Sequence, residues 1–545
     1  MTQQGQAAHF LGVDVGTGSA RAGVFRPDGE LIAHAKRDIA LYREDGNIAE
    51  QSSENIWQAV CESVREAVAQ SGVAPADIGG IGFDATCSLV VLDRDMQPLS
   101  ISKTGDNNRN IIVWMDHRAT EQAQQINAGG HTVLNYVGGT ISPEMQTPKL
   151  LWLKTHMPDT YHAAGAFFDL PDYLTWRATG DLARSRCSVT CKWTYLGHED
   201  RWDADFFKNV GLDELAREGF SRIGNRILDV GTALGQGLSA EAARDLGLQS
   251  QTPVAVSIID AHAAGIGTVG AQGDYGDATA RIGYVFGTSA CTMSSSREGQ
   301  FVPGVWGPYY AAMIPGLWLN EGGQSAAGEA IAHLVRCHPA YPDACERAKA
   351  AGLHVLSFLL NEIDALDLPA DQIISLARQM VVVPEFLGNR APFADPDARA
   401  VIAGLDLDDS MNGLIALYIA GISGLGYGLR QILEVQRENG VAPELVVISG
   451  GAGSHPVIKQ LLADSCGLPL ADTSCDEPVL LGSAMLGAVA AGAYENVPDA
   501  MQAMSRLGKV YTPASGPSAA RHTQRYKAFE ALQTAARLTR SEDQP

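Results

Sequence analysis

A carboxylate, two hydroxyl groups and two glycines stand close together near the start of the chain, in residues 14–19. Glycines allow positive φ angles and let backbone N–H groups close on phosphate oxygens, and hydroxyl groups add further donors. A carboxylate at a strand end can hold a magnesium ion through water. A plain β-turn is the alternative. The segment predicts a phosphate site in which Asp14 binds the metal ion and the nucleotide contacts are Gly16, Thr17, Gly18, Ser19 and Arg21.

Two further glycine turns follow apolar runs, one after residues 282–286 and one after residues 445–448. The second of these precedes a helix that starts near Pro456, and free N–H groups at a helix N-terminus suit a phosphate or a ribose. One such turn is a weak signal, but three turns, each after a buried strand, are more specific. We expect the turn after residues 282–286 to face the turn in residues 14–19, so that the two clasp the phosphates of a nucleotide from both lobes, while the third turn offers a further nucleotide contact. The expected contacts are Gly287, Thr288, Ser289, Gly450, Gly451, Ala452 and Gly453.

A carboxylate also follows the apolar run 254–259, in the segment Asp260-Ala261-His262-Ala263-Ala264-Gly265. This segment resembles the catalytic-base motif of the FGGY carbohydrate kinases. The three glycine turns, in this order, resemble the two phosphate motifs and the adenosine motif of the actin-like, ribonuclease-H-like ATPase superfamily. Residues 148–153 and 389–392 resemble the signatures of the two lobes of the kinases, although Gln146 departs from the usual residue beside the first signature. His455 likewise departs from the asparagine that is frequent in the adenosine motif.

The resemblance implies that Asp260 takes the proton from a sugar hydroxyl and, together with Asp14, holds the metal ion. An alcohol is a poor nucleophile, and a positioned carboxylate helps it to attack the γ-phosphate of ATP. The alternative for Asp260 is a helix N-cap, a position where aspartate is common. The implied cofactors are ATP and Mg²⁺.

Polar residues beside apolar runs could read the hydroxyl groups of a sugar, because a site that hydrogen-bonds hydroxyls rejects analogues lacking them. Residues 82–90 resemble the D-ribulokinase-like pentulose kinases of the same family. Lys192 and Glu321 match a substrate lysine and a substrate glutamate of ribulokinases, although either could be a surface charge. The resemblance implies a ketopentose, with ribulose as the best match and L-ribulokinase, xylulokinase or another polyol kinase as alternatives. The implied substrate contacts are Asp84, Thr86, Cys87, Asp116, Lys192, Asp260 and Glu321.

The elements that must position these residues begin with three strands, at residues 9–15, 20–25 and 31–39. Turn residues at 27–30 make their pairing antiparallel. This order differs from the strand–glycine loop–helix order of a dinucleotide fold or a Walker loop. Helices and strands alternate afterwards, which indicates an α/β class. The predicted elements are a helix at 53–71 capped by Ser53, strands at 78–83, 89–92, 282–286 and 445–448, and helices at 456–466 and 480–494.

The two halves of the chain open in a similar way. Aligning Gly16 on Gly287 puts Val285 at the position of Asp14, so that only the first copy keeps the carboxylate. An internal repeat and a chance similarity both explain this short match.

The 545 residues are too many for one hydrophobic core, and residues 270–280 have the glycine- and aspartate-rich composition of a linker. We therefore expect an α/β protein with two ribonuclease-H-like (actin-like ATPase) lobes, residues 9–270 and 271–530. The sugar is expected mostly on the first lobe and ATP mostly on the second. An interlobe cleft that closes on both substrates would exclude water and prevent hydrolysis of ATP.

The composition narrows the range of partners and compartments. A net charge of −22 disfavours binding to nucleic acid or to an anionic membrane surface. We expect no signal peptide and no membrane span. The 9 cysteines lack a framework spacing, which predicts a reducing cytoplasm. Cys187 and Cys191 could share one helical face, but no second ligand pair stands nearby in the sequence, so we expect a structural role for them rather than a metal site.

The expected partners are therefore a small sugar and ATP, and a homodimer is allowed. The alternative from another functional class is a non-catalytic, nucleotide-gated binding or sensor protein of the same fold. Asp260, which such a protein would not need, argues against it, and so does the lack of a basic helix-turn-helix or a long substrate-binding appendage. Steady ATP turnover that responds to a sugar would separate the two classes.

Overall fold

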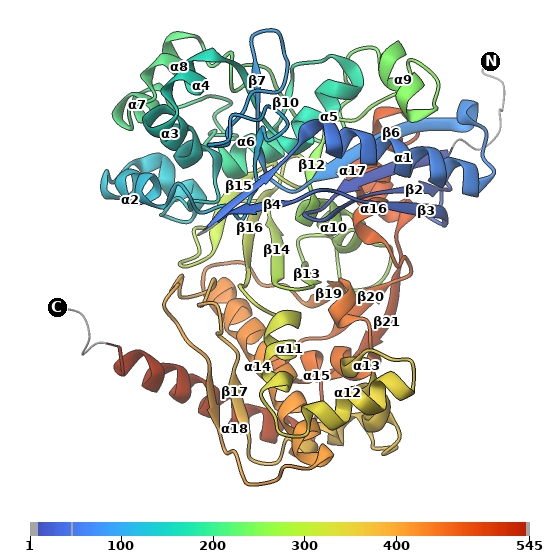
Figure 1. Ribbon diagram of the computed structural model, residues 1–545. Helices are drawn as coiled ribbons and strands as arrows, with labels where there is room; N and C mark the ends of the chain where they lie inside the picture. Colours follow the sequence, from blue (N-terminus) through green and yellow to red (C-terminus); the bar gives the residue numbers. More distant parts are fainter. Residues whose placement is uncertain (1–8, 45–46, 541–545) are drawn as a thin grey trace.

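Two bodies, one above the other in Figure 1, make up the protein, whose computed structural model describes residues 9–44 and 47–540. The upper body contains a five-stranded sheet in the order β12-β6-β1-β2-β3. Strand β1 pairs with β2 in antiparallel and with β6 in parallel orientation. The predicted strand–turn–strand–hairpin–strand order is confirmed. The strands are β1 (His9–Val15), β2 (Ser19–Phe25), β3 (Leu31–Asp38), β6 (Ile78–Ala85) and β12 (Ile258–Ile259).

The lower body contains a seven-stranded sheet in the order β15-β16-β14-β13-β19-β20-β21. Strand β13 is antiparallel to β14 and parallel to β19, as β1 is to β2 and β6. Asp14 lies opposite Asp84 in the first sheet, and Val285 lies opposite Ser449 in the second. The internal repeat is confirmed, with Val285 in the place of Asp14. The strands are β13 (Arg281–Phe286), β14 (Ala290–Ser296), β15 (Trp306–Tyr310), β16 (Trp318–Gln324), β19 (Leu445–Ser449), β20 (Leu470–Thr473) and β21 (Leu507–Tyr511).

A third sheet, in the order β4-β5-β8-β7-β9, enlarges the upper body, and two strand pairs complete the sheets of the described residues. The predicted strand at 89–92 is confirmed as β7. The third sheet consists of β4 (Tyr42–Glu44), β5 (Ile48–Gln51), β7 (Leu89–Asp93), β8 (Ile111–Ile112) and β9 (Ala164–Asp169), and the pairs are β10 (Arg184–Ser185) with β11 (Ile227–Leu228) and β17 (Val381–Val383) with β18 (Val401–Ala403).

The helices of the upper body begin with the predicted helix at 53–71, which is confirmed as α1. Its cap is Ser52 rather than Ser53, because the Ser52 hydroxyl accepts a hydrogen bond from the N–H of Asn55 while Ser53 is already inside the helix. The helices up to the junction of the two bodies are α1 (Ser53–Ser71), α2 (Thr120–Ala128), α3 (Gln146–His156), α4 (Pro158–Ala163), α5 (Leu170–Thr179), α6 (Arg186–Lys192), α7 (Ala204–Asn209), α8 (Asp213–Arg217), α9 (Ala240–Leu246) and α10 (Asp260–Val269).

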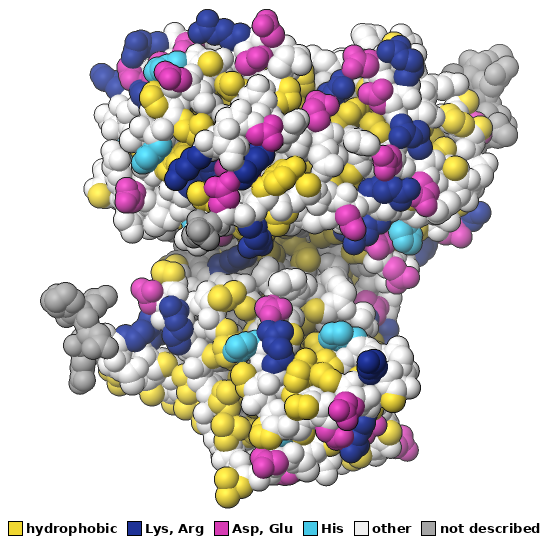
Figure 2. Space-filling model, viewed as in Figure 1, with side chains coloured by type: hydrophobic (Ala, Val, Ile, Leu, Met, Phe, Trp, Pro, Cys, Tyr) yellow, Lys and Arg dark blue, Asp and Glu magenta, His cyan; other side chains and the backbone are white. Residues whose placement is uncertain are grey.

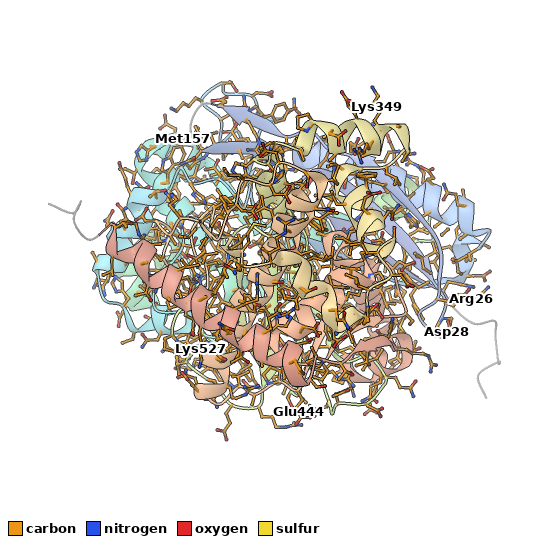
Figure 3. The ribbon with its side chains drawn as sticks, turned by 90° about the horizontal axis from the view of Figure 1, so that it is seen from below. Arg26, Asp28, Met157, Lys349, Glu444 and Lys527 are labelled. Atoms are coloured by element: carbon orange, nitrogen blue, oxygen red, sulfur yellow. The ribbon has the colours of Figure 1, made fainter. Side chains whose placement is uncertain are left out.

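The predicted helices at 456–466 and 480–494 are confirmed as α15 and α16. Helix α14 is long and apolar enough to span a membrane, but 89% of its apolar window is buried inside the protein, which accounts for its composition. Viewed from below in Figure 3, α18 crosses the lower body and carries the exposed Lys527. The later helices are α11 (Gly328–Arg336), α12 (Tyr341–Ala350), α13 (Val355–Asp364), α14 (Met411–Glu438), α15 (Pro456–Cys466), α16 (Pro478–Ala490), α17 (Val497–Met504) and α18 (Gly516–Leu538), and the 3₁₀ segments are Pro75–Asp77, Thr132–Val137, Ala370–Ala377 and Gly451–Gly453.

Two helices cross at the junction of the bodies. Helix α10 follows β12 of the first sheet but contacts β13 of the second, and α16, from late in the chain, packs on β1 and β6 of the first sheet. Glycines permit this close approach: a Cβ atom on Gly12 would lie 1.9 Å from the Leu480 carbonyl oxygen, and one on Gly82 would lie 1.9 Å from that of Ser483. The C-terminal part of the chain therefore contributes to the core under the N-terminal sheet.

Candidate active site

Three carboxylates gather where β1, β6 and β12 end. Asp14 lies opposite Asp84 on parallel strands, and Ile259, the last residue of β12, lies opposite Ala85, so Asp260 follows at the same edge. Asp84 is fully buried and its Oδ2 accepts a hydrogen bond of 2.5 Å from Ser483 Oγ. Burial and the neighbouring Asp14 raise the pKa of Asp84. The same two causes raise the pKa of Asp260 to about 6.

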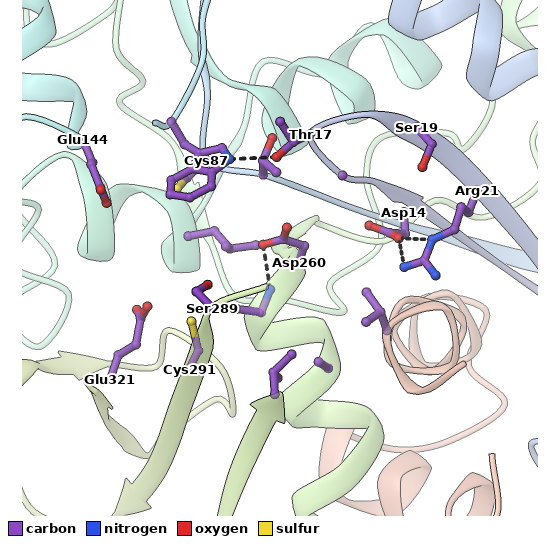
Figure 4. Close-up of a pocket in the computed structure, with 18 of the residues that line it drawn as sticks. Asp14, Thr17, Ser19, Arg21, Cys87, Glu144, Asp260, Ser289, Cys291 and Glu321 are labelled. Atoms are coloured by element: carbon purple, nitrogen blue, oxygen red, sulfur yellow. Dashed lines mark hydrogen bonds and ion pairs between the residues drawn. The ribbon is translucent and has the colours of Figure 1, made fainter. Parts of the chain in front are cut away.

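Asp260 is the first residue of α10, whose N-cap position is occupied by Ile259. Its Oδ1 accepts a hydrogen bond of 2.7 Å from the N–H of Ala261, the next residue. Among the described residues, it accepts none from the N–H groups further along the first turn, as a helix cap would. The helix-cap alternative therefore accounts poorly for this carboxylate, which also faces a cavity between the two bodies (Figure 4).

That cavity has a volume of about 520 Å³ and opens into the groove between the bodies that Figure 2 shows. It brings together residues that are far apart in the sequence and come from both halves of the chain. Several predicted nucleotide, metal and sugar contacts line it together: Asp14, Gly16, Thr17, Ser19, Arg21, Thr86, Cys87, Lys192, Asp260, Ser289 and Glu321.

Other predicted contacts do not line this cavity. Asp116 is fully buried outside it, and its oxygens accept hydrogen bonds from the N–H of Ala49 and from the Arg118 guanidinium. That Asp116 binds the sugar stays a prediction; in the structure its carboxylate is used within the first body. Asp84 lies behind Asp14 and is held by Ser483. The remaining residues outside the cavity lining are Gly18, Gly287, Thr288, Gly450, Gly451, Ala452 and Gly453.

The first two glycine turns close in the same way. The N–H of Gly16 donates to the Ser19 carbonyl at 3.0 Å, and that of Gly287 donates to the Ser289 carbonyl at 2.9 Å. The glycines of these two turns do not have positive φ angles. They therefore leave space beside the backbone rather than permit an unusual backbone conformation. Thr17 Oγ1 accepts a hydrogen bond of 2.9 Å from Trp114 Nε1.

The third turn lies against the second. Gly450 has φ of 96°, and a Cβ atom there would lie 2.5 Å from the Phe286 carbonyl oxygen, so only glycine fits. Gly328, at the start of α11, donates its N–H to the Gly287 carbonyl at 2.9 Å, and a Cβ atom on it would lie 3.2 Å from Ala452. The two turns and the N-terminus of α11 therefore form one glycine-lined surface on the second body.

Arg21 is already engaged by carboxylates. It forms an ion pair with Asp14 (Figure 4), and its Nη1 lies 2.8 Å from Glu477 Oε2. The contact with Glu477 links β2 to the segment that precedes α16. Arg21 in this arrangement holds Asp14 in place, whereas the sequence suggested a contact to phosphate.

Glu321 lines the cavity on the side away from Asp14 and Arg21 (Figure 4), and Lys192, which also lines it, is close enough to attract the charge of Glu321. Burial alone would raise the pKa of Glu321, but the charge of Lys192 and a hydrogen bond from His262 lower it to about 2. The Lys192 Nζ lies 5.0 Å from the ring centroid of Trp306. The two residues are therefore a buried cation and a buried anion beside an aromatic plane, an arrangement that suits the hydroxyl groups and apolar face of a sugar.

Sequence reasoning missed several residues of this end of the cavity. Arg390 comes from the second body and lies 5.7 Å from the Trp306 centroid, and its Nη1 lies 3.6 Å from Cys291 Sγ. Within residues 9–44 and 47–540, it forms no ion pair with a carboxylate. Glu144 also lines the cavity, at 3.4 Å from His117 Nε2. Arg390 lies in residues 389–392, which resemble the second-lobe signature of the kinases, and that resemblance was the available signal.

Comparison with known proteins agrees with this arrangement. Residues 9–267 match the N-terminal domain and residues 283–491 match the C-terminal domain of the FGGY family of carbohydrate kinases. The chain belongs to this family. An FGGY carbohydrate kinase domain-containing protein of Xenopus laevis is 43% identical over 520 residues, which are 94% of this chain and 94% of that protein.

Two further relatives are informative at different levels. A D-ribulokinase of Saccharomyces cerevisiae is 38% identical over 523 residues, covering 90% of this chain and 73% of the relative. The crystal structure of a xylulose kinase from Lactobacillus acidophilus superposes with a TM-score of 0.79 at 19% identity, over 98% of this chain and 100% of that one. At this identity the superposition shows the two-domain, actin-like ATPase fold alone.

As an FGGY carbohydrate kinase, the protein uses ATP, and its carboxylates suit the accompanying metal ion. Oxygen atoms are the ligands that Mg²⁺ prefers. Asp84 Oδ1 is buried without a hydrogen-bond partner in the described structure, next to Asp14 and Asp260. A cation would reduce the repulsion among the three carboxylates and could bind the unpaired oxygen. The residues therefore fit a magnesium ion.

Proposed function

We propose that this FGGY kinase transfers the γ-phosphoryl group of ATP to a hydroxyl group of a ketopentose, with ribulose as the substrate. The observation that carries the proposal is the single cavity into which Asp260, Lys192 and Glu321 all open, with two phosphate-type turns at its rim. A relative named D-ribulokinase supports the choice of sugar at 38% identity.

In the proposed reaction, Asp260 accepts the proton of the attacking hydroxyl. The hydroxyl oxygen forms a bond to the γ-phosphorus while the bond to the β-phosphate oxygen breaks, and ADP leaves. Burial and the charge of Asp14 give Asp260 a pKa of about 6, so it is ionised at neutral pH and still basic enough to take a proton. The pKa is thus suited to a general base.

The magnesium ion is proposed to be held by Asp14 and Asp260, with Asp84 behind them. When bound, it would neutralise negative charge on the transferred phosphoryl group. The ion pair with Arg21 fixes the Asp14 carboxylate at the strand end. Gly16, Thr17 and Ser289 are proposed to face the phosphates from the two sides of the cavity. The glycine-lined surface of the second body, which includes Gly450, is proposed to bind adenosine.

The division into a lobe of residues 9–270 and a lobe of residues 271–530 stays our proposal. The sugar, however, is proposed to touch both lobes rather than mostly the first. Lys192 and Glu144 come from the first, and Glu321, Trp306 and Arg390 come from the second. A sugar that binds both lobes would itself draw them together, and closure would exclude water from the phosphoryl transfer.

A coupled ADP-release assay tests the proposal. The panel would contain both enantiomers of ribulose and of xylulose, the corresponding pentitols, and glycerol. We expect sugar-dependent ADP release with the highest kcat/KM for a ribulose enantiomer. A higher kcat/KM for xylulose or for a polyol would reassign the substrate, and ATP turnover that no sugar stimulates would contradict the proposal of a sugar kinase reaction in this cavity.

A further inference from the structure

A cluster of two cysteines and a histidine lies directly beneath the sugar end of the cavity. Cys187 and Cys191 are on α6, and His262 is on α10. All three are buried, and their ligating atoms lie within 4.8 Å of one another. The same short helix α6 ends at Lys192, and α10 begins at Asp260.

The distance between Cys187 and His262 decides what the cluster is. The Sγ atom of Cys187 lies 3.0 Å from His262 Nδ1. A zinc ion bonded to both atoms, with bonds of about 2.3 Å to sulfur and about 2.0 Å to nitrogen at the tetrahedral angle, would hold them about 3.5 Å apart. The shorter separation indicates a direct hydrogen bond between the sulfur of Cys187 and the ring of His262.

The other nitrogen of the same ring faces Glu321, which lines the substrate cavity. His262 Nε2 lies 3.4 Å from Glu321 Oε2, and the His262 side chain is fully buried. Within residues 9–44 and 47–540, no other hydrogen bond to the Glu321 carboxylate is formed. Because Nδ1 meets Cys187 and Nε2 meets Glu321, the ring is held from both sides and its orientation is fixed.

We propose that His262 is a positioning residue that fixes the carboxylate of Glu321 toward the sugar. This inference rests on the proposed function, because it assigns Glu321 to the sugar. The hydrogen-bonded chain Cys187–His262–Glu321 connects three elements: the helix that ends in Lys192, the helix that begins with Asp260, and β16 of the second body. It therefore sets the sugar-binding carboxylate in a fixed relation to the cation and to the base.

Such a chain matters because misplacement of a reactive group by about 1 Å can cost roughly 100-fold in rate. Glu321 has 6% of its surface exposed, so water offers it little support if His262 is lost. The remaining charged neighbours, Lys192 and Arg390, attract the carboxylate electrostatically but form no hydrogen bond that fixes the direction of its oxygens among the described residues.

Two substitutions separate positioning from simple packing. The amide nitrogen of glutamine can take the place of Nε2 and donate to Glu321, whereas that of asparagine corresponds to Nδ1 and cannot reach Glu321. We expect His262→Asn to raise the KM for the sugar roughly 10- to 100-fold, the usual effect of losing a hydrogen bond to a charged group, with the KM for ATP unchanged. We expect His262→Gln to restore most of the sugar affinity.

The matched control uses His522, a second buried histidine, which hydrogen-bonds Tyr427 in the second body far along the chain. His522→Asn and His522→Gln should change thermal stability but leave the KM for the sugar as in the wild type. Equal sugar KM values for His262→Asn and His262→Gln, or an equal rise in the KM for ATP, would overturn the positioning role.

Metal analysis of the same purified enzymes provides the second arm. We expect no stoichiometric zinc in the purified enzyme, before or after incubation with zinc. Stoichiometric zinc that is lost in Cys187→Ser would overturn the inference, because the cluster would then be a metal site. Wild-type enzyme inactive on every ketopentose would refute the proposed function; the variants would then be compared on whichever acceptor stimulates ADP release.

Discussion

Asp14 and Asp84 lie directly opposite each other on the parallel strands β1 and β6, so two buried carboxylates share one edge of the first sheet. Burial raises the pKa of Asp84, and the charge of Asp14 raises it further, because two facing carboxylates resist being ionised together. Asp260, at the end of the next strand, experiences the same field. The strand ends therefore set the protonation of the proposed base.

We predict that kcat/KM for the sugar falls as the pH drops below about 6 at saturating ATP. The base must be ionised to accept a proton, and burial, followed by the charge of Asp14, raises the pKa of Asp260 to about 6. Asp14→Asn removes that charge, so the acid limb of the profile should move to lower pH even if the plateau is reduced. A pH–rate series on the two enzymes measures the shift.

Asp277→Asn is the control for this series, because Asp277 is a half-exposed carboxylate of the linker that pairs with Arg297. Its profile should coincide with that of the wild type, and the ionisation of ATP itself cancels in the comparison. An acid limb that stays in place or moves upward in Asp14→Asn would contradict the assignment of the limb to Asp260.

Arg390 is predicted to serve the sugar. Its guanidinium faces the cavity beside Trp306, and although no ion pair within 4 Å is formed among the described residues, the charges of Glu144 and Glu321 help to raise its pKa. Arg390→Met keeps the aliphatic stem and removes the charge. We expect the KM for the sugar to rise roughly 10- to 100-fold, with only a small change in the melting temperature.

Arg347→Ala provides the comparison, since Arg347 pairs with Asp343 on the exposed face of α12. Kinetics and thermal unfolding are measured for both variants. Only Arg390→Met should raise the KM for the sugar. A lower melting temperature for Arg390→Met with an unchanged sugar KM would mean that Arg390 supports the fold and not the substrate.

Gly12 is predicted to be essential for the packing of α16 on β1. A Cβ atom there would lie 1.9 Å from the Leu480 carbonyl oxygen, a backbone atom that cannot turn aside. Gly12→Ala should therefore lower the free energy of unfolding by about 1–3 kcal/mol or more. Gly18→Ala is the control for stability, because no atom lies within 4 Å of the added Cβ. Equal denaturation midpoints for the two variants would contradict this account.

The sequence was sufficient for the elements whose signal is local. The strand that ends at Asp14 and the repeat that aligns Val285 with it are written in consecutive residues, and the register of the two sheets agrees with both. The same holds for Asp260, which follows its apolar run directly.

Contacts between segments that are distant in the chain could not be predicted from the sequence. Asp116 follows an apolar run just as a ligand would, but Arg118, two residues later, and the N–H of Ala49 occupy its carboxylate. The position of His262 between Cys187 and Glu321 depends on three segments that meet only when both bodies are folded. Local patterns cannot distinguish a carboxylate that faces a cavity from one that is satisfied inside.

The last prediction concerns Asp260 itself. Asp260→Asn keeps the size of the side chain and can still accept a hydrogen bond from the N–H of Ala261, but it cannot take up a proton. If Asp260 is the general base, phosphoryl transfer should fall roughly 10²- to 10⁴-fold while calorimetry gives nearly unchanged affinity for the sugar. If it only supported the start of α10, asparagine would serve almost as well and activity would survive. Asp14→Asn should behave differently, since a weakened magnesium site should recover in part at high magnesium concentration. Near-normal turnover by Asp260→Asn would remove the proposed base and leave the fold assignment intact.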